Sequence, residues 1–295
     1  MTKSNSWDTA ARARASNRWT KASADWNTAM TDALLDAAAL EPVSRVLDLA
    51  AGSGDPALSI AQRLSGGRII ALDSSRAGLL LANTHARKLG LASKMLCIQG
   101  DAHAIPLASN CVDRITCRCG IMFLTDTGLV MSEMLRVLKP GGRVALLAWG
   151  PFEQPLFDAM IAPVLRVVHG AEMPAEARTM FRFSSPGSLK RELRAAGLCN
   201  VHEESLLVPR IWAGSPPELW MYLQEISTLC RPLFASIPPD LRATVDAEVS
   251  SALGRFRSGS VLEVPAKVIV AIGQTRVSRS QLSRGSRDIA ARPDP

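Results

Sequence analysis

Residues 46–61 read VLDLAAGSGDPALSIA, and this stretch decides the fold class of the protein. A short apolar run typical of a buried strand leads directly into a turn of alanine, glycine and serine at residues 50–54. Small residues there let the backbone approach a ligand closely and adopt positive φ angles. Asp55 and Pro56 follow, and we expect Asp55 to cap a helix that has Pro56 as its first residue. A strand, a small-residue turn and a helix in this order favour a nucleotide-binding site.

Two familiar glycine motifs are absent from this stretch. No Lys-Ser or Lys-Thr pair follows the glycines, which argues against a P-loop, and the G-x-G-x-x-G spacing of a dinucleotide fold is missing. Gly52 and Gly54 alone are a weak signal, because an ordinary strand-to-helix turn has the same composition. The interpretation therefore depends on the segments that follow.

Two acidic residues stand where the next strands end. Residues 69–72 predict a second strand that ends at Asp73, whose carboxylate can accept hydrogen bonds from two ribose hydroxyls. Residues 94–99 predict a third strand, followed by Asp101 and Ala102, which can bond the amino group and the ring of an adenine. Each carboxylate also has a simpler interpretation, since Asp73 can cap the next helix and Asp101 can be an ordinary turn residue.

The alternation of strands and helices continues along the chain. We predict strands over residues 112–117 and 143–149, separated by a helix over residues 127–138 that ends in a Lys-Pro-Gly-Gly turn. Strands that alternate with helices in this way form a parallel sheet with right-handed crossovers. A ligand of such a sheet binds at the carboxyl ends of the strands.

Five motifs follow one another in a fixed order between about residues 40 and 151: VLDLAAGSGD, ALDSS, GDAHAIPL, CVDRITCRCGIMFLTD and EMLRVLKPGGRVALLAWGP. In this order they resemble the class I S-adenosylmethionine-dependent methyltransferases, in the type 11 branch that includes the ubiquinone/menaquinone C-methyltransferases. The resemblance implies an α/β fold: a Rossmann-like, doubly wound sheet of seven strands, the last antiparallel between strands five and six. It implies S-adenosylmethionine as the cofactor and S-adenosylhomocysteine as its product.

The resemblance also implies which residues bind the cofactor. Asp48 and the glycine turn would hold its methionine part, Asp73 the ribose, and Asp101 with Ala102 the adenine. The cofactor-binding residues expected in this way are Asp48, Ala50, Gly52, Gly54, Asp73, Ser74, Asp101, Ala102, Cys117 and Arg118. Ala50 stands where the family has its first loop glycine, a variant that this branch tolerates.

No residue is a strong catalytic candidate. Displacement of a methyl group from a sulfonium mainly needs alignment and the exclusion of water. His103 is a weak candidate for a base, but it adjoins the adenine-binding pair, which favours a supporting role. The other histidines, His85, His169 and His202, are expected on the surfaces of helices or strands. We expect Arg118, Met122, Phe123 and Trp149 near the reacting end.

The composition favours a cytoplasmic globular enzyme. The chain has 295 residues, 47% of them hydrophobic, and it shows no apolar leader and no apolar run long enough to span a bilayer. Its six cysteines form no C-x-x-C pair, so we expect neither a disulfide framework nor a metal site. Cys117 and Cys119 are expected to be small buried hydrophobes, with a thiol-rich site as the alternative.

We divide the chain into four parts. Residues 1–40 are expected to form a helical cover, with Trp19, Trp26, Met30 and Ala33 on one helix face. Residues 41–150 form the cofactor-binding core, and residues 151–275 complete it and add a helical lid. Residues 276–295 carry five arginines and are predicted to be a disordered basic tail. No aromatic residue interleaves these arginines, which argues against a nucleic-acid partner.

In the part that completes the core, we predict helices over 184–196, 216–229 and 240–256 and strands over 201–211 and 261–272. The candidate walls of the lid are Trp212, Trp220, Met221, Tyr222 and Leu223, with plain core packing as the alternative. The substrate-contacting residues expected overall are Met122, Phe123, Trp149, Trp220 and Tyr222.

The function predicted from the sequence is methyl transfer from S-adenosylmethionine to a hydrophobic small-molecule acceptor, a quinol or phenol methylated on carbon or oxygen. One alternative is a protein that binds S-adenosylmethionine or a partner without catalysis. Another is a nucleotide-dependent oxidoreductase, against which the missing G-x-G-x-x-G spacing counts. We expect no stable membrane insertion and no nucleic-acid partner, and the sequence is compatible with a homodimer.

Overall fold

The computed structural model describes residues 18–19 and 21–277, and its centre is one mixed sheet of eight strands. Along the sheet the strands lie in the order β3-β2-β1-β4-β5-β8-β6, and β7 pairs with β8 beside this path. β1 to β5 are parallel, and β8 is antiparallel to both β5 and β6. The strands are β1 (Arg45–Leu49), β2 (Arg68–Asp73), β3 (Met95–Gln99), β4 (Val112–Arg118), β5 (Leu138–Trp149), β6 (Cys199–Trp212), β7 (Arg257–Ser258) and β8 (Val261–Gln274). The predicted fold class is confirmed.

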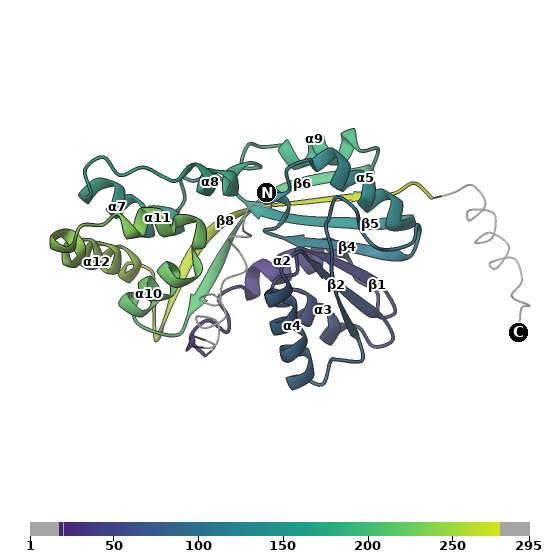
Figure 1. Ribbon diagram of the computed structural model, residues 1–295, viewed down its shortest axis with the longest axis horizontal. Helices are drawn as coiled ribbons and strands as arrows, with labels where there is room; N and C mark the ends of the chain where they lie inside the picture. The colour runs from purple at the N-terminus through teal and green to yellow at the C-terminus, as the bar shows by residue number, and fades with distance from the viewer. Residues whose placement is uncertain (1–17, 20, 278–295) are drawn as a thin grey trace, which may run out of the picture.

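Helices cover both faces of the sheet (Figure 1). One face carries α2 (Thr28–Ala38), α3 (Ala57–Arg63) and α4 (Arg76–Lys88), and the other carries α5 (Thr127–Val137) and α9 (Ser188–Ala195). Successive residues of a strand point to opposite faces, so the core divides into two layers. In β1, Leu47 and Leu49 pack in the cluster with α5 and α9, whereas Val46 packs with α3 and α4.

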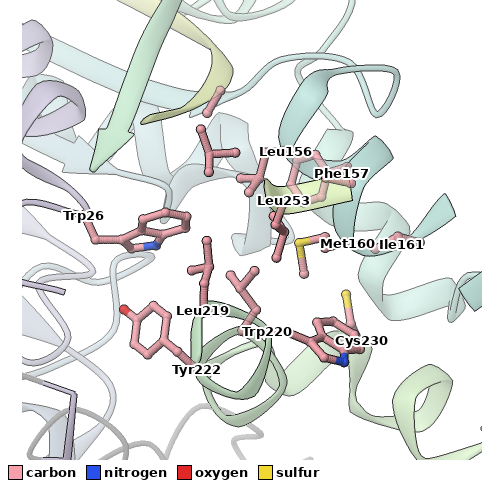
Figure 2. Packing of buried hydrophobic residues seen from close by; sticks show 14 of the residues in the cluster. Trp26, Leu156, Phe157, Met160, Ile161, Leu219, Trp220, Tyr222, Cys230 and Leu253 are labelled. Atoms are coloured by element: carbon pink, nitrogen blue, oxygen red, sulfur yellow. The ribbon is translucent and has the colours of Figure 1, made fainter. Parts of the chain in front are cut away.

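A second group of helices lies around the far ends of β6 and β8, at the left of Figure 1. These two strands have fourteen residues each, and the first residues of β8 continue past β5, which ends at the pair Trp149 and Val268. The helices are α6 (Pro155–Met160), α7 (Ala162–Val167), α8 (Ala175–Arg178), α10 (Pro216–Ile226), α11 (Arg231–Ala235) and α12 (Pro239–Gly254). They enclose the largest buried cluster, part of which Figure 2 shows.

The N-terminal cover differs from the prediction. Trp19 and Trp26 are both buried, but α2 begins only at Thr28, and residues 21–27 form turns. The two tryptophans therefore do not share one helix face. The Trp19 carbonyl accepts from both the amide and the hydroxyl of Ser23, at 2.9 and 2.8 Å, and the Trp26 carbonyl accepts from Nε of Arg210 at 3.0 Å.

Several boundaries also differ. β5 begins at Leu138, five residues before the predicted strand, because the Lys-Pro-Gly-Gly turn is drawn into the sheet with Gly141 at φ +77°. Helices α6, α7 and α8 occupy a region for which the sequence predicted no helix. The helix over 216–229 ends at Ile226, and α9 begins at Ser188 instead of 184.

The residues outside the described ranges include most of the predicted basic tail and part of the predicted N-terminal cover. Of the basic tail predicted over 276–295, only residues 276 and 277 are described. Of the N-terminal cover, residues 1–17 and residue 20 lie outside the described ranges. Across the described chain, no helix is both long and apolar enough to cross a membrane. No group of three or more His, Cys, Asp or Glu side chains placed to hold a metal ion occurs in these same residues.

Candidate functional site

The small-residue turn after β1 combines an open side with a tightly packed side. A Cβ atom added to Gly52 would have no atom within 4 Å, so this part of the turn borders open space. A Cβ atom added to Gly54 would lie 3.0 Å from the Cβ atom of Ala82, because the turn packs closely against α4. Both glycines have positive φ angles, +52° and +107°. The turn can therefore receive a ligand beside Gly52, while the close packing of Gly54 against α4 fixes the position of the turn.

Ala50 has a left-handed backbone with φ +57°, which explains why the family has a glycine here. A Cβ atom on Gly120 would lie 2.4 Å from the Cβ atom of Ala50 and 2.9 Å from the sulfur of Cys117. Gly120, which follows β4, thus makes room for the Ala50 side chain. The sequence analysis did not single out Gly120, although it stands in the quoted motif after strand four.

Asp73 lies at the carboxyl end of β2 and supports the turn. Its Oδ2 accepts a hydrogen bond from the Gly52 amide at 2.8 Å, and its Oδ1 accepts one from the Ser75 amide at 2.7 Å. Ser75, not Asp73, caps α4, through a hydrogen bond of 3.1 Å from the Gly78 amide. A carboxylate oxygen accepts more than one hydrogen bond, so Asp73 retains acceptor capacity for hydroxyl groups. Ser74 beside it is exposed, and its carbonyl accepts from Gln99 at 3.1 Å.

Asp101 and His103 form a rigid turn after β3. Asp101 Oδ1 accepts from the His103 amide at 2.9 Å and lies 2.6 Å from its ring Nδ1. The hydrogen bonds from His103 hold the pKa of Asp101 below its usual range. The other ring nitrogen accepts from the Asp126 amide at 3.4 Å, which places the proton of a neutral ring on Nδ1. Both nitrogens of His103 are thus engaged, and Ala102 between the two residues is buried.

Asp48 is fully buried in β1 and only half satisfied. Its Oδ1 accepts from the Thr116 hydroxyl at 2.7 Å. Its Oδ2 has no hydrogen-bond partner among the described residues. Burial raises the pKa of Asp48 to about 7, against the opposing effects of Thr116 and Arg118. A buried carboxylate oxygen without a partner is costly, and a cationic ligand would satisfy it.

A cluster of Arg118, Asp55 and Thr31 joins β4, the glycine turn and α2; Thr31 is buried, Arg118 is nearly so, and Asp55 is partly exposed. Arg118 donates to Asp55 Oδ2 at 2.5 Å, to the Asp55 carbonyl at 3.1 Å and to the Thr31 hydroxyl. Burial is the largest single effect and disfavours the charge of Arg118, but Asp55, Cys119 and Asp48 together outweigh it, and the pKa of Arg118 is raised. The prediction that Asp55 caps α3 is wrong, because this carboxylate binds Arg118 and Pro56 occupies the cap position.

Cys117 and Cys119 are free thiols. Burial raises the pKa of both, to about 11 for Cys119, so neither is a thiolate at neutral pH. This agrees with their interpretation as small hydrophobic side chains.

Three of the predicted substrate residues gather at the carboxyl ends of β4 and β5. Met122 is buried and its sulfur lies 3.3 Å from the Trp149 amide. Trp149 packs edge-on against Phe157, with ring centres 5.3 Å apart, and Phe123 is half-buried beside the same cluster as Trp149.

The other two predicted substrate residues are part of the core and face different ways in α10. Trp220 and Tyr222 are only 2% and 7% exposed. Tyr222 faces Trp26, whereas Trp220 lies on the far side of the cluster near Cys230 (Figure 2). The Trp220 indole donates to Asp246 at 2.7 Å, which ties α10 to α12. Tyr222 thus lies toward the sheet, and Trp220 serves the packing of the helices.

Arg210 of β6 is a buried cation that the sequence analysis missed. It is 6% exposed, donates from Nε to the Trp26 carbonyl at 3.0 Å, and donates from Nη2 to Asn27 Oδ1 at 2.6 Å. Its guanidinium lies over Trp26 and Trp149, at 4.1 and 5.3 Å from the ring centres. Burial lowers the pKa of Arg210 to about 10, so it stays charged at neutral pH. Its place in the apolar run LLVPRIW was the available signal.

Comparison with known proteins decides the family. A profile described as a methyltransferase domain matches residues 40–184. A ubiquinone/menaquinone biosynthesis C-methyltransferase, UbiE, of Dinoroseobacter shibae is 32% identical over 185 residues, 59% of this chain and 74% of the relative. The chain belongs to the class I S-adenosylmethionine-dependent methyltransferase family, in the UbiE-like branch. UbiE of Cereibacter sphaeroides is 33% identical over 127 residues, and this chain spans about half of the length of that relative (51%).

Solved structures confirm the methyltransferase fold. YcgJ of Bacillus subtilis gives a TM-score of 0.54 at 21% identity, covering 84% of this chain and 98% of that one. A [4+2]-cyclase, SpnF, gives 0.51 at 20% identity, covering 84% of this chain and 80% of that one. Because proteins described as a methyltransferase and as a cyclase share this fold, the function of a family member has to be argued from its site.

Proposed function

We propose that the protein transfers the methyl group of S-adenosylmethionine to a hydrophobic small molecule, a quinol or phenol. The observation that carries this proposal is the pairing of the open space beside Gly52 with the unsatisfied Oδ2 atom of buried Asp48. An amino-acid group with a cationic amine suits both features, and it is the part of this cofactor that the family holds at this turn. The relatives named as quinone C-methyltransferases support the acceptor class.

Each part of the site has a role in this proposal. Asp48 would bind the amino group, Asp73 the ribose hydroxyls, and the Asp101 turn the adenine. When bound, S-adenosylmethionine would supply a methyl group on a cationic sulfur; the nucleophile attacks the methyl carbon from the side opposite the sulfur, which leaves. Met122, Phe123 and Trp149 would orient the acceptor and exclude water around this point. His103 is not assigned as a base, since Asp101 and Asp126 engage both of its nitrogens.

Calorimetric titration with S-adenosylmethionine and S-adenosylhomocysteine tests the cofactor. We expect the wild type to bind with micromolar affinity and Asp73→Ala to bind at least tenfold more weakly. The control Asp240→Ala changes an exposed residue of α12 and should leave the affinity unchanged. Failure of a well-folded wild type to bind either compound would overturn the proposal. Binding of a nicotinamide nucleotide instead would favour the oxidoreductase alternative.

The acceptor class needs a second measurement. Transfer of a labelled methyl group to quinols and phenols is expected with the wild type, and not with neutral apolar compounds that lack a hydroxyl. Tight cofactor binding with no transfer to any quinol or phenol would favour the alternative of a non-catalytic binding protein. A cytoplasmic location, a homodimer and the absence of a nucleic-acid partner stay predictions from the sequence.

A further inference from the structure

We propose that Arg210 binds a carboxylate group of the methyl acceptor, which makes the acceptor a phenol-like aromatic acid. This inference rests on the proposed function and narrows its substrate class. It is argued from the charge of Arg210, from its place along the sheet, and from its aromatic neighbours.

Arg210 is a buried charge without a counter-ion. Among the described residues no Asp or Glu pairs with it, and its two hydrogen bonds go to the neutral Trp26 carbonyl and Asn27 amide oxygen. These bonds use two of its five N–H donors, and Nη1 has no acceptor within the described chain. By contrast, buried Arg118 is paired with Asp55. A buried cation is ordinarily paired, so Arg210 points to an anionic partner other than the described residues.

The position of Arg210 assigns this partner to the acceptor. The turn that holds the proposed cofactor lies between β1, β2 and β4, whereas Arg210 lies near the end of β6, with β5 and β8 between β6 and β4. Its guanidinium contacts Trp149 at the carboxyl end of β5, the residue that is expected beside the acceptor. Arg210 is nevertheless close enough to Arg118 for the two like charges to interact. It therefore lies beside the proposed point of transfer, on the side away from the ribose and adenine residues.

The neighbours of Arg210 suit a flat acid. The indole nitrogen of Trp26, whose ring lies under the guanidinium, is a buried donor that has no acceptor among the described residues. The indole nitrogen of Trp212 is also without an acceptor there, but it lies beside Gly214, in the loop that leads to α10. Trp26 and Tyr222 lie beside each other (Figure 2) and pack edge-on, with ring centres 6.1 Å apart. Trp212 stacks on Tyr222 with ring centres 5.0 Å apart. A guanidinium presents its N–H groups in a planar fork that matches the two oxygens of a carboxylate. Unsatisfied donors within an aromatic wall thus favour an aromatic ring that carries a carboxylate.

The test compares an acid with its neutral amide. 3-(4-Hydroxyphenyl)propionate and 3-(4-hydroxyphenyl)propionamide are titrated into the protein saturated with S-adenosylhomocysteine. We expect the wild type to bind the acid at least tenfold more tightly than the amide. Arg210→Gln should abolish this preference and leave the affinity for S-adenosylhomocysteine unchanged. The control Arg166→Gln removes an exposed arginine paired with Glu248 and should behave as the wild type.

Asn27→Asp separates anion binding from a structural role of Arg210. The substitution is nearly isosteric and places a carboxylate 2.6 Å from Nη2, which supplies the missing counter-ion within the chain. We expect it to raise the melting temperature and also to abolish the preference for the acid. This variant keeps the inference testable if Arg210→Gln fails to fold.

Three outcomes would overturn the inference. The wild type binds acid and amide equally, or Asn27→Asp leaves the preference for the acid intact. In the third, Arg210→Gln lowers the affinity for S-adenosylhomocysteine but not for 5′-methylthioadenosine, which lacks the amino-acid part. That result would mean that Arg210 binds the carboxylate of the cofactor. A preference for the acid in a protein that binds no S-adenosylhomocysteine would instead support the arginine site and refute methyl transfer.

Discussion

At the scale of single residues, the glycine turn depends on volume shared between positions far apart in the chain. Ala50 carries a side chain in a left-handed conformation, and Gly120 after β4 leaves the space that this side chain fills. Gly52 beside it keeps open the space that a ligand needs. Each of these three positions is small for a different physical reason.

We predict that Gly120→Ala destabilises the protein by about 1–3 kcal/mol, since the new Cβ atom would overlap Ala50 and the sulfur of Cys117. Thermal unfolding measures this change. Adding Ala50→Gly should recover part of the loss, because it removes the closer clash and relaxes the backbone at position 50. The control Gly66→Ala meets only one atom at 3.3 Å and should change stability little. Equal stability of Gly120→Ala and the wild type would contradict the packing argument.

Asp48 is expected to make the stability of the ligand-free protein depend on pH. Burial raises its pKa from 3.8 to about 7, so between about pH 4 and pH 7 the folded protein holds a proton that the unfolded chain releases. The contribution of Asp48 therefore lowers the free energy of unfolding as the pH rises through this window. Asp48→Asn should remove this loss and stabilise the protein above pH 7 by on the order of 2–4 kcal/mol.

Chemical denaturation between about pH 4 and pH 8 checks this prediction, with Asp158→Asn as the control. Partial burial also raises the pKa of Asp158, but this residue is exposed overall. The substitution at Asp158 should therefore change the pH dependence of stability little. We expect Asp48→Asn to lose affinity for S-adenosylmethionine at the same time. A variant with the pH profile of the wild type would show that the Asp48 carboxylate titrates normally.

At the scale of elements, the cluster of Arg118, Asp55 and Thr31 holds α2, the glycine turn and β4 together. Its two charges differ in exposure, 11% for the Arg118 side chain and 37% for that of Asp55. Water can therefore solvate Asp55 when its partner is removed, whereas Arg118 would be left as a buried, unpaired charge.

We therefore predict unequal costs for breaking this pair from either side. Asp55→Asn should lower the free energy of unfolding by about 3–5 kcal/mol, and Arg118→Met by clearly less, as measured by urea denaturation. Asp32→Asn breaks an ion pair with Arg63 in which both side chains are nearly half exposed, so it should cost less than about 1 kcal/mol. Equal costs for Asp55→Asn and Arg118→Met would mean that water reaches both charges.

At the scale of the whole molecule, Trp212 joins three parts that are distant in the sequence. It is fully buried at the end of β6 and contacts Trp19 and Trp26 of the N-terminal segment and Tyr222 of α10. Trp212 lies where the paired strands β6 and β8 extend from the sheet to the group of helices at the left of Figure 1. Trp212 therefore joins the N-terminal segment, here residues 18–19 and 21–27, to β6 and α10.

Trp212→Ala is predicted to destabilise the protein by about 3–5 kcal/mol and to release the N-terminal segment. Limited proteolysis should then cut within residues 21–27 under conditions in which these residues of the wild type are not cut. Leu207→Ala, at an exposed position of the same strand, is the matched control and should change neither property. A resistant Trp212→Ala would show that other contacts suffice to hold the segment.

Local sequence was enough to predict the core of the fold. β1 and β2 are short apolar runs, each followed by a polar or small-residue turn, as expected for central strands of a parallel sheet that are buried on both faces. β3 is equally short but lies at the edge, where Leu96 is exposed. The positions of Gly52 and Asp73 followed from the same pattern, since the carboxyl ends of neighbouring strands lie at one edge. Asp48 and Arg118 were expected at this edge from the family resemblance.

Only the tertiary structure decided the partners of these residues. Asp55 looked like a helix cap because local hydrogen bonds are all that a sequence window contains, yet its carboxylate binds Arg118, 63 positions away. Gly120 and Arg210 gain their roles from Ala50 and from Trp26, which chain folding brings beside them from distant positions. The sequence by itself determined the strands, the turn and the family, because these depend on local periodicity and spacing. The burial of charge and the shape of the acceptor side depend on contacts between distant segments, and these exist only in the folded chain.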